Sequence, residues 1–312
     1  MTDMKFSKYI LGLVLLATSI VSLGQQTPQY TQYMFNDFII NPAIAGTHDY
    51  YQIRTTNRFQ WVGLKDAPIT NTLSVYGPHK SQPMGWGGYV LSDNTGPTGK
   101  IGLYGAYGYH INIQRDMQLS FGLSIGFTQY KVDTKKITFE EEEVAFDKNK
   151  YTFMKPDAIA GVYLYASRYF AGISVDQLFN SKLKIFKEDT AITSSVFNRL
   201  KSHFTMVGGY KFNLNRDFDM EPTILLRATG KTIPQAEVTA KAIYQKMVWL
   251  AITFRTSDAV SILAGYNHKD KIYIGYSYDI TYSKIRIKSG GTHEIMIGAR
   301  FNKVRTGSNP KM

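Results

Sequence analysis

The 312-residue sequence contains no cysteine. This absence excludes disulfide bonds, thiol nucleophiles and cysteine-ligated metal centres at once. Histidine is also sparse: the six histidines stand singly, and no His-Glu-x-x-His or comparable ligand spacing links them. We therefore expect no catalytic residues, no metal site and no cofactor, and we predict that the protein is not an enzyme.

Long apolar runs are missing from most of the chain. Beyond residue 24 no stretch is apolar for the ~20 residues that a membrane-spanning helix needs, and the mean hydropathy is −0.21. Residues 1–24 resemble a secretory signal peptide, because Lys5 and Lys8 precede the apolar run 10–17. We predict cleavage after Gly24. A membrane-anchoring helix is the alternative, but the run is short for that role.

Several segments alternate strictly between apolar residues and small or polar ones, as in 119–127 and 248–255. Successive side chains of a strand point to opposite faces, so one face can contact lipid while the other lines a polar or packed lumen. The alternation places His203, Lys211 and Arg255 on the lumen side. Aromatic residues make up 14% of the chain, which suits the aromatic belts at membrane interfaces. The pattern predicts an all-β, transmembrane outer-membrane β-barrel.

About fourteen antiparallel strands are expected. The barrel is predicted over residues 51–302, followed by a C-terminal tail over 303–312. Glycines within the strands permit tight barrel curvature or the close approach of a plug, as at Gly85, Gly102, Gly105 and Gly108. The expected strands are 52–60, 70–77, 85–92, 99–111, 117–131, 157–166, 169–175, 201–213, 218–228, 236–244, 246–255, 260–267, 271–278 and 292–301.

The connections between these strands are alternately short and long. Bacterial outer-membrane barrels have short periplasmic turns and longer external loops, so the alternation predicts a periplasmic start to the barrel. One expected external loop, 256–259, is as tight as the periplasmic turns. The short connections are 112–116, 167–168, 214–217, 245 and 269–270, and the long ones are 132–156, 176–200 and 279–291.

The segment 25–50 differs from the strands. Its apolar residues recur at helical spacing until Asn41-Pro42 ends the pattern. We predict a short amphipathic helix or folded plug on the periplasmic side of the barrel. Residues of this segment, with one tryptophan beyond it, are candidates for partner docking or for plug and turn roles: Tyr30, Tyr33, Met34, Phe35, Phe38, Asn41, Pro42, Gly46 and Trp61.

Acidic residues are fewer than basic ones, and the formal net charge is +12. This excess favours anionic partners; lipopolysaccharide, an acidic periplasmic protein or an acidic cargo segment suit an exported barrel better than nucleic acid. Lys284, Arg286 and Lys288 would share one face of an extended loop and are candidates for contact with such a partner. A solvated lumen, solvated turns and a solvated strand extension are the alternatives. The acidic run 140–143 is interpreted as a solvated loop, with cation or basic-partner binding as the alternative.

A set of motifs in a fixed order resembles the PorP/SprF family of type IX secretion membrane proteins. Each motif alone is weakly specific, but together they extend over nearly all of the chain after residue 24. The main ones are Gln-Tyr-Met-Phe-Asn at 32–36, Asn-Pro-Ala-Ile-Ala-Gly at 41–46, Gln-Trp-Val-Gly at 60–63, Leu-Ser-Phe-Gly-Leu-Ser at 119–124, Ile-Gly-Tyr-Ser-Tyr-Asp at 274–279 and Gly-Thr-His-Glu-Ile-Met-Ile at 291–297.

The resemblance implies a Bacteroidetes outer-membrane barrel that supports secretion or surface attachment of a partner protein, including adhesins of gliding motility. It implies contact with outer-membrane lipids, with periplasmic ring subunits of the secretion system and with an adhesin or a C-terminal sorting domain. The family offers no catalytic residues to assign. Barrel architecture alone would equally suit a passive channel, or a purely structural anchor for a surface protein.

Overall fold

The computed structural model describes residues 27–136, 150–184, 197–230, 232 and 234–304. The predicted signal peptide, the acidic run 140–143 and most of the predicted tail lie outside these residues. Within the described ranges, no helix is long and apolar enough to cross a membrane.

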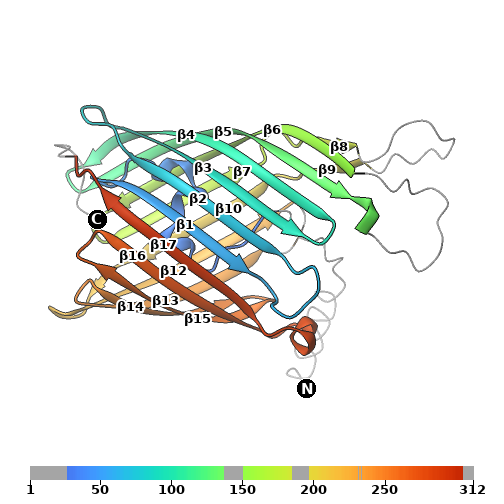
Figure 1. The fold of residues 1–312 in the computed structure, drawn as a ribbon. Coiled ribbons are helices and arrows are strands. Elements are labelled where there is room, and N and C mark those ends of the chain that lie inside the picture. Colours follow the sequence, from blue (N-terminus) through green and yellow to red (C-terminus); the bar gives the residue numbers. More distant parts are fainter. Residues whose placement is uncertain (1–26, 137–149, 185–196, 231, 233, 305–312) are drawn as a thin grey trace, which may run out of the picture.

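The described chain is almost entirely antiparallel β-sheet wound into a barrel (Figure 1). The strands are β1 (Tyr51–Phe59), β2 (Ile69–Pro78), β3 (Met84–Thr95), β4 (Thr98–Gln114), β5 (Met117–Asp133), β6 (Lys150–Ala166), β7 (Tyr169–Asp176), β10 (His203–Tyr210), β11 (Phe212–Asn213), β12 (Phe218–Thr229), β13 (Gln235–Tyr244), β14 (Val248–Arg255), β15 (Ala259–His268), β16 (Ile272–Thr281) and β17 (Thr292–Phe301). Two further strands, β8 (Lys182–Lys184) and β9 (Phe197–Arg199), pair only with each other.

The sheet closes on itself. β1 pairs with β17, with Thr55 opposite Ile297, and β10 pairs with β12 on the far side. Only Lys211 separates β10 from β11, and both strands pair with β12. Counted as one, they turn the 15-stranded sheet into a closed barrel of fourteen strands, which confirms the prediction.

Side chains alternate between the lipid-facing surface and the lumen as the sequence pattern predicts. In β5, Phe121, Leu123, Ile125 and Phe127 are exposed on the outer surface. The intervening small and polar residues, such as Ser124, point inward and are buried. Because the strand period is two, this one pattern sets the apolar exterior of the whole barrel.

The two ends of the barrel differ. We call one the short-turn end, formed by the turns 79–83, 115–116, 167–168, 214–217, 245–247 and 269–271, and the other the long-loop end. The long-loop end has two tight connections, 96–97 and 256–258, where one was predicted. β6 begins at Lys150 rather than at Asp157, so the loop before it is shorter than predicted. The last strand, β17, ends at the short-turn end (Figure 1).

The N-terminal segment, residues 27–50, runs through the barrel lumen and forms the plug. It contains three single turns of 3₁₀ helix, η1 (Tyr33–Phe35), η2 (Asp37–Ile39) and η3 (Pro42–Ile44). Of the two predicted alternatives, the segment therefore forms the folded plug and not the amphipathic helix. Short 3₁₀ turns suit a chain whose side chains must contact walls on every side.

The plug starts at the end opposite to the predicted one. Thr27 contacts His203 and Gln29 contacts Gln235, both at the long-loop end, whereas β1 starts at the short-turn end. The segment therefore crosses the full lumen before β1 begins. The turn lengths predicted the side on which β1 starts, but they carry no information about a segment that precedes it.

Candidate functional site

A cluster of buried charges fixes the first part of the plug to the barrel wall. We call it the latch, and its members come from the plug and from five strands. All of them are at least nine-tenths buried. They are Thr31 in the plug, Arg58 in β1, Glu237 in β13, Arg255 in β14, Asp279 in β16 and Glu294 in β17.

Thr31 lies at the centre of the latch. Its hydroxyl donates to Asp279 at 2.9 Å and accepts from Arg58 at 2.8 Å and from Arg255 at 3.1 Å. Its backbone N–H donates to the Glu294 carboxylate at 2.9 Å. One small plug residue therefore joins four charged side chains of the wall.

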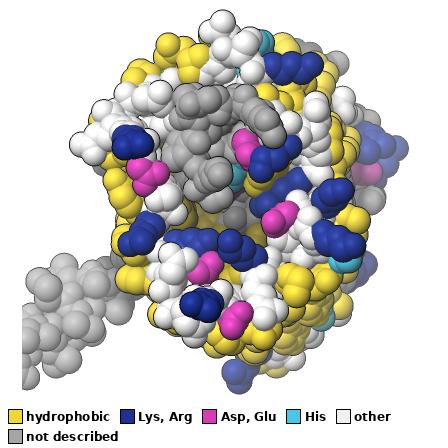
Figure 2. Space-filling view, turned by 90° about the vertical axis from the view of Figure 1, so that its left-hand side faces the viewer, with side chains coloured by type: hydrophobic (Ala, Val, Ile, Leu, Met, Phe, Trp, Pro, Cys, Tyr) yellow, Lys and Arg dark blue, Asp and Glu magenta, His cyan; other side chains and the backbone are white. Residues whose placement is uncertain are grey.

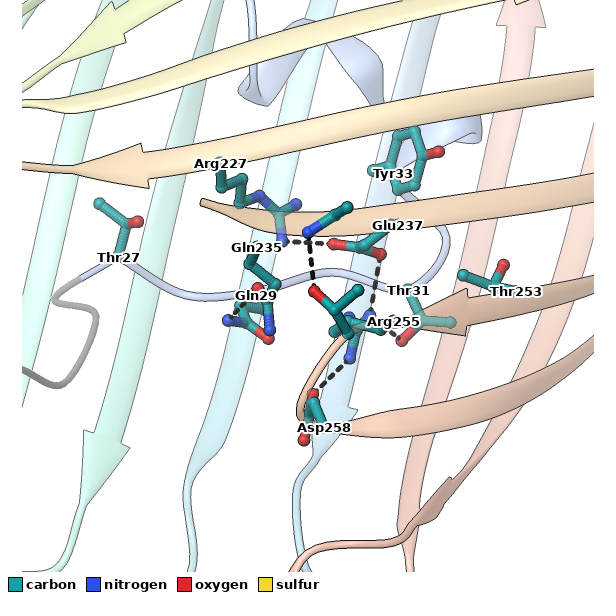
Figure 3. Close-up of polar contacts among 12 residues, drawn as sticks. Thr27, Gln29, Thr31, Tyr33, Arg227, Gln235, Glu237, Thr253, Arg255 and Asp258 are labelled. Atoms are coloured by element: carbon teal, nitrogen blue, oxygen red, sulfur yellow. Dashed lines mark hydrogen bonds and ion pairs between the residues drawn. The ribbon is translucent and has the colours of Figure 1, made fainter. Parts of the chain in front are cut away.

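The wall charges also pair with one another. Arg58 contacts Asp279 at 2.8 Å and Glu294 at 3.0 Å, and Arg255 contacts Glu237 at 3.2 Å. Figure 3 shows Arg255 between Glu237 and Asp258, with Thr31 of the plug beside it. Charges buried this deeply are tolerated only when paired and hydrogen-bonded, so removing one partner leaves a costly unpaired charge.

Aromatic residues hold the middle of the plug against well-separated parts of the barrel wall. The Phe35 ring stacks on Trp249 of β14 with centroids 4.2 Å apart, and the Phe38 ring stacks on Tyr76 of β2 at 4.4 Å. Tyr33 is buried and its hydroxyl hydrogen-bonds Thr223 of β12. The plug therefore extends across the lumen instead of lying along one side.

The last turn of the plug, η3, is shaped by its own sequence. Asn41 caps the turn, since its side-chain oxygen accepts from the Ala43 N–H at 3.0 Å, and Pro42 occupies the first position, where its missing N–H costs nothing. The Asn41 amide also donates to the Val162 carbonyl of β6. Gly46 then turns the chain with a φ of +86°, a conformation that glycine adopts at little cost.

A row of four glycines forms the wall under η3. In the strand register Gly85 lies opposite Gly108, Gly108 opposite Gly122, and Gly122 opposite Gly161. A Cβ on Gly108 would lie 2.7 Å from the Ala45 carbonyl oxygen, and one on Gly122 would overlap the Ala43 backbone nitrogen. The row therefore lets plug backbone lie directly on strand backbone, the close approach that intrastrand glycine permits.

At the short-turn end the plug leaves the lumen past stacked rings. The Arg300 guanidinium lies over Tyr50 at 4.3 Å and over Tyr273 at 4.1 Å from the ring centroids, and the His48 ring stacks on Tyr50. Burial, with the positive charges of Arg300 and Arg54 adding to it, lowers the pKa of His48 to about 3. Figure 2 shows this end, where basic and acidic side chains ring the opening and hydrophobic ones cover the outside.

The predicted docking or plug residues do not form one cluster. Tyr30, Tyr33, Phe38, Asn41, Pro42 and Gly46 are buried inside the barrel, and Met34 and Phe35 are half-buried there. Trp61 lies apart from them in the loop after β1 at the long-loop end, where its backbone N–H donates to the Thr292 hydroxyl. The structure therefore separates Trp61 from the plug.

The prediction that three basic residues share one face of an extended loop is wrong. Lys284, Arg286 and Lys288 lie at the long-loop end in a 3₁₀ helix, η5 (Lys284–Lys288), and not in an extended loop. With three residues per turn, positions two apart point in different directions. The three side chains are exposed but do not share a face.

The latch is the main feature that sequence reasoning missed. Of its members, only Arg255 was predicted to face the lumen, although Arg58, Asp279 and Glu294 also occupy inward positions of alternating strands. The alternation of each strand therefore indicates that these charges face inward. It does not indicate which of them contact one another, because that depends on closure of the barrel, which brings β1 beside β17. Among the described residues, no group of His, Asp and Glu is arranged to hold a metal ion.

The plug is expected to block ion flow. The lumen of a β-barrel widens with its strand number: side chains can fill an eight-stranded barrel, whereas porins of 16 to 18 strands enclose an aqueous channel. A fourteen-stranded barrel is intermediate in width, so its wall side chains leave space that the plug fills. We expect the full chain to show little steady conductance in planar bilayers and a variant lacking residues 27–47 to conduct ions. A large steady conductance of the full chain would contradict a seated plug.

Comparison with known proteins agrees with this architecture. The family model for "Type IX secretion system membrane protein PorP/SprF" matches residues 22–299. A search of curated protein sequences finds no match to the chain. Among solved structures, a FadL homologue of Pseudomonas aeruginosa has 11% sequence identity and a TM-score of 0.50, and the alignment covers 89% of this chain and 95% of that one.

Two other solved structures are also similar to this chain. The CymD monoaromatic hydrocarbon channel has 10% identity, with 89% and 93% of the two chains covered and a TM-score of 0.48. The KdgM porin has 6% identity, with 80% and 99% covered and a TM-score of 0.40. At such low identity, the similarity to the FadL homologue establishes an outer-membrane barrel fold and nothing about substrates.

Proposed function

Because the chain belongs to the PorP/SprF family of type IX secretion system membrane proteins, we propose that it is a non-enzymatic outer-membrane accessory of that system. In this role it supports secretion or surface attachment of a partner protein, an adhesin or a cargo with a C-terminal sorting domain. A signal peptide ending at Gly24 would export the chain. The observation that supports an accessory over a channel is the plug, whose Tyr33 and Phe38 contact opposite walls of the lumen, β12 and β2.

The short-turn end is proposed to face the periplasmic ring of the secretion system, since bacterial barrels place their short turns in the periplasm. All six of its turns carry exposed basic residues, seven in total against three acidic ones. This excess would favour an acidic protein surface. The basic residues are Lys80, Arg115, Arg168, Arg216, Lys246, Lys269 and Lys271, and the acidic ones are Asp116, Asp217 and Asp270.

The direct test is affinity purification of the tagged full chain from native outer membranes in mild detergent, with mass spectrometry of the bound proteins. We expect secretion-ring subunits, a sorting-domain adhesin or both to remain bound. Recovery of the barrel alone would contradict the accessory role.

We expect a charge-reversal triple variant at the short-turn end to reduce recovery of the periplasmic subunits at least tenfold. The variant combines Lys80→Glu, Arg115→Glu and Arg168→Glu. The matched control reverses Lys284, Arg286 and Lys288 at the opposite end and should leave those subunits bound. Equal losses in both variants would argue against docking at the short-turn end.

Secretion assays separate export from anchoring. In a deletion strain, an export defect retains the cargo in the periplasm, whereas loss of an anchor releases it into the medium. If every sorting-domain protein were secreted and displayed normally in that strain, both roles would be excluded.

A further inference from the structure

The long-loop half of the lumen contains a cavity that neither the latch nor the proposed secretion role uses. Its volume is about 80 Å³. One side is formed by the plug, including Thr27 and Tyr30, and the other by the barrel wall, from strands β3 to β7, β10 and β12. The cavity is thus lined by two parts of the chain, the plug and the barrel wall, which are brought together only when the plug is seated.

The charges around this cavity leave an excess of carboxylate. Two cations line it, but each already has an acidic partner outside the lining: Lys100 pairs with Asp93 at 3.5 Å, and Arg227 pairs with Glu237 at 2.8 Å. Two carboxylates also line it, Asp157 and Asp176. Within the described part of the chain, no basic side chain forms an ion pair with either of them.

Unpartnered hydrogen-bond acceptors point to a missing donor. Gln177 lines the cavity and is 6% exposed, yet its side-chain oxygen has no hydrogen-bond partner among the described residues. The Oδ1 atom of Asp176 is likewise buried without a partner there. Buried polar atoms are normally satisfied, so two acceptors without donors, on neighbouring residues that both line the cavity, suggest a ligand that supplies N–H groups.

The aromatic residues of the cavity suit the same ligand. The rings of Tyr89 and Tyr104 stack with centroids 4.7 Å apart, and both residues line the cavity. The Tyr104 hydroxyl donates to Asp157 at 3.1 Å, which positions that carboxylate. Aromatic faces beside carboxylates form an environment that attracts organic cations.

We propose that this cavity binds the cationic head of an organic molecule, an alkylammonium or a guanidinium group. Asp157 and Asp176 supply the negative charge, Gln177 accepts a hydrogen bond, and the tyrosine rings contact the apolar part of the head. A cavity of about 80 Å³ has room for such a head. Two sources carry this chemistry: a free small amine, and a lysine or arginine side chain of a polypeptide. The proposal is independent of the secretion role.

The test uses the full chain in detergent micelles and saturation-transfer NMR with three probes: methylguanidinium, its neutral isostere methylurea, and a blocked arginine peptide. We expect methylguanidinium to bind and methylurea to bind at least tenfold more weakly. The double variant Asp157→Asn, Asp176→Asn should weaken methylguanidinium binding at least tenfold. Asp219→Asn is the matched control, because Asp219 is a buried lumen carboxylate at the short-turn end, outside the cavity.

The comparison of methylguanidinium with methylurea on the unaltered chain does not depend on any variant folding. Equal affinity for the two probes, no binding of the cation, or unchanged binding in the double variant would each overturn the proposal. Binding of both the free cation and the blocked peptide would identify a polypeptide side chain as an accessible ligand, whereas binding of the free cation alone would identify a small amine.

Discussion

Replacing Arg58 with methionine is expected to cost about 3–5 kcal/mol of stability and to release the plug, because removal of one partner leaves buried charges uncompensated. Arg58 contacts Asp279 and Glu294, which are both almost fully buried, and it also donates to Thr31 of the plug. Urea unfolding of the barrel in detergent micelles, followed by tryptophan fluorescence, measures the loss. Methionine keeps most of the side-chain volume, so the effect reports mainly on charge.

A single cysteine can report the plug directly, because the chain has none of its own. Ala43→Cys places a thiol at a fully buried plug position. A water-soluble maleimide should label it slowly in the otherwise unaltered chain and rapidly when Arg58→Met is added. The control is Lys303→Met, since the pair between Lys303 and Asp49 is exposed and surface pairs contribute about 0–1 kcal/mol.

A double-variant cycle distinguishes the latch from simple loss of packing. If Arg58 acts through its carboxylate partners, Glu294→Gln should cost less stability in the Arg58→Met background than in the unaltered chain. Additive costs would show that these charges do not hold the plug. Slow maleimide labelling of the Ala43→Cys thiol in the Arg58→Met background would lead to the same conclusion.

Gly122→Ala is expected to displace the final turn of the plug. The added Cβ would overlap the Ala43 backbone nitrogen, and backbone cannot move aside as a flexible side chain can. Overpacking of this kind costs roughly 1–3 kcal/mol, and more where neighbours cannot relax. Faster maleimide labelling of the thiol introduced by Ala43→Cys and raised bilayer conductance would report the displaced turn.

Gly105→Ala is the matched control for this substitution. Gly105 lies in β4, next to β5, but a Cβ there would have no atom within 4 Å. The same chemical change should therefore leave labelling, conductance and unfolding nearly as they were. Similar effects at Gly105 and Gly122 would indicate a general loss of strand flexibility and would remove the argument that the glycine row seats the plug.

The barrel could be predicted from the sequence because its signals are local. Strict alternation within β5 and β14 specifies which side chains face lipid, and the period of two holds wherever a strand pairs. Turn lengths predicted the two unlike ends, and intrastrand glycines such as Gly85 and Gly108 indicated close approach of a plug. These features need no knowledge of which distant residues meet.

Only the tertiary structure decided the path of the plug and the composition of the latch. Arg58 of β1 meets Glu294 of β17 across 236 positions of sequence, and that contact exists only because closure of the barrel places β1 beside β17. The direction of the plug, from Thr27 at the long-loop end to β1 at the short-turn end, was likewise set by inward-facing partners from many strands. Each strand by itself determines only which of its two faces points inward. Contacts between inward side chains of different strands form only in the lumen of the closed barrel, so no single strand determines them.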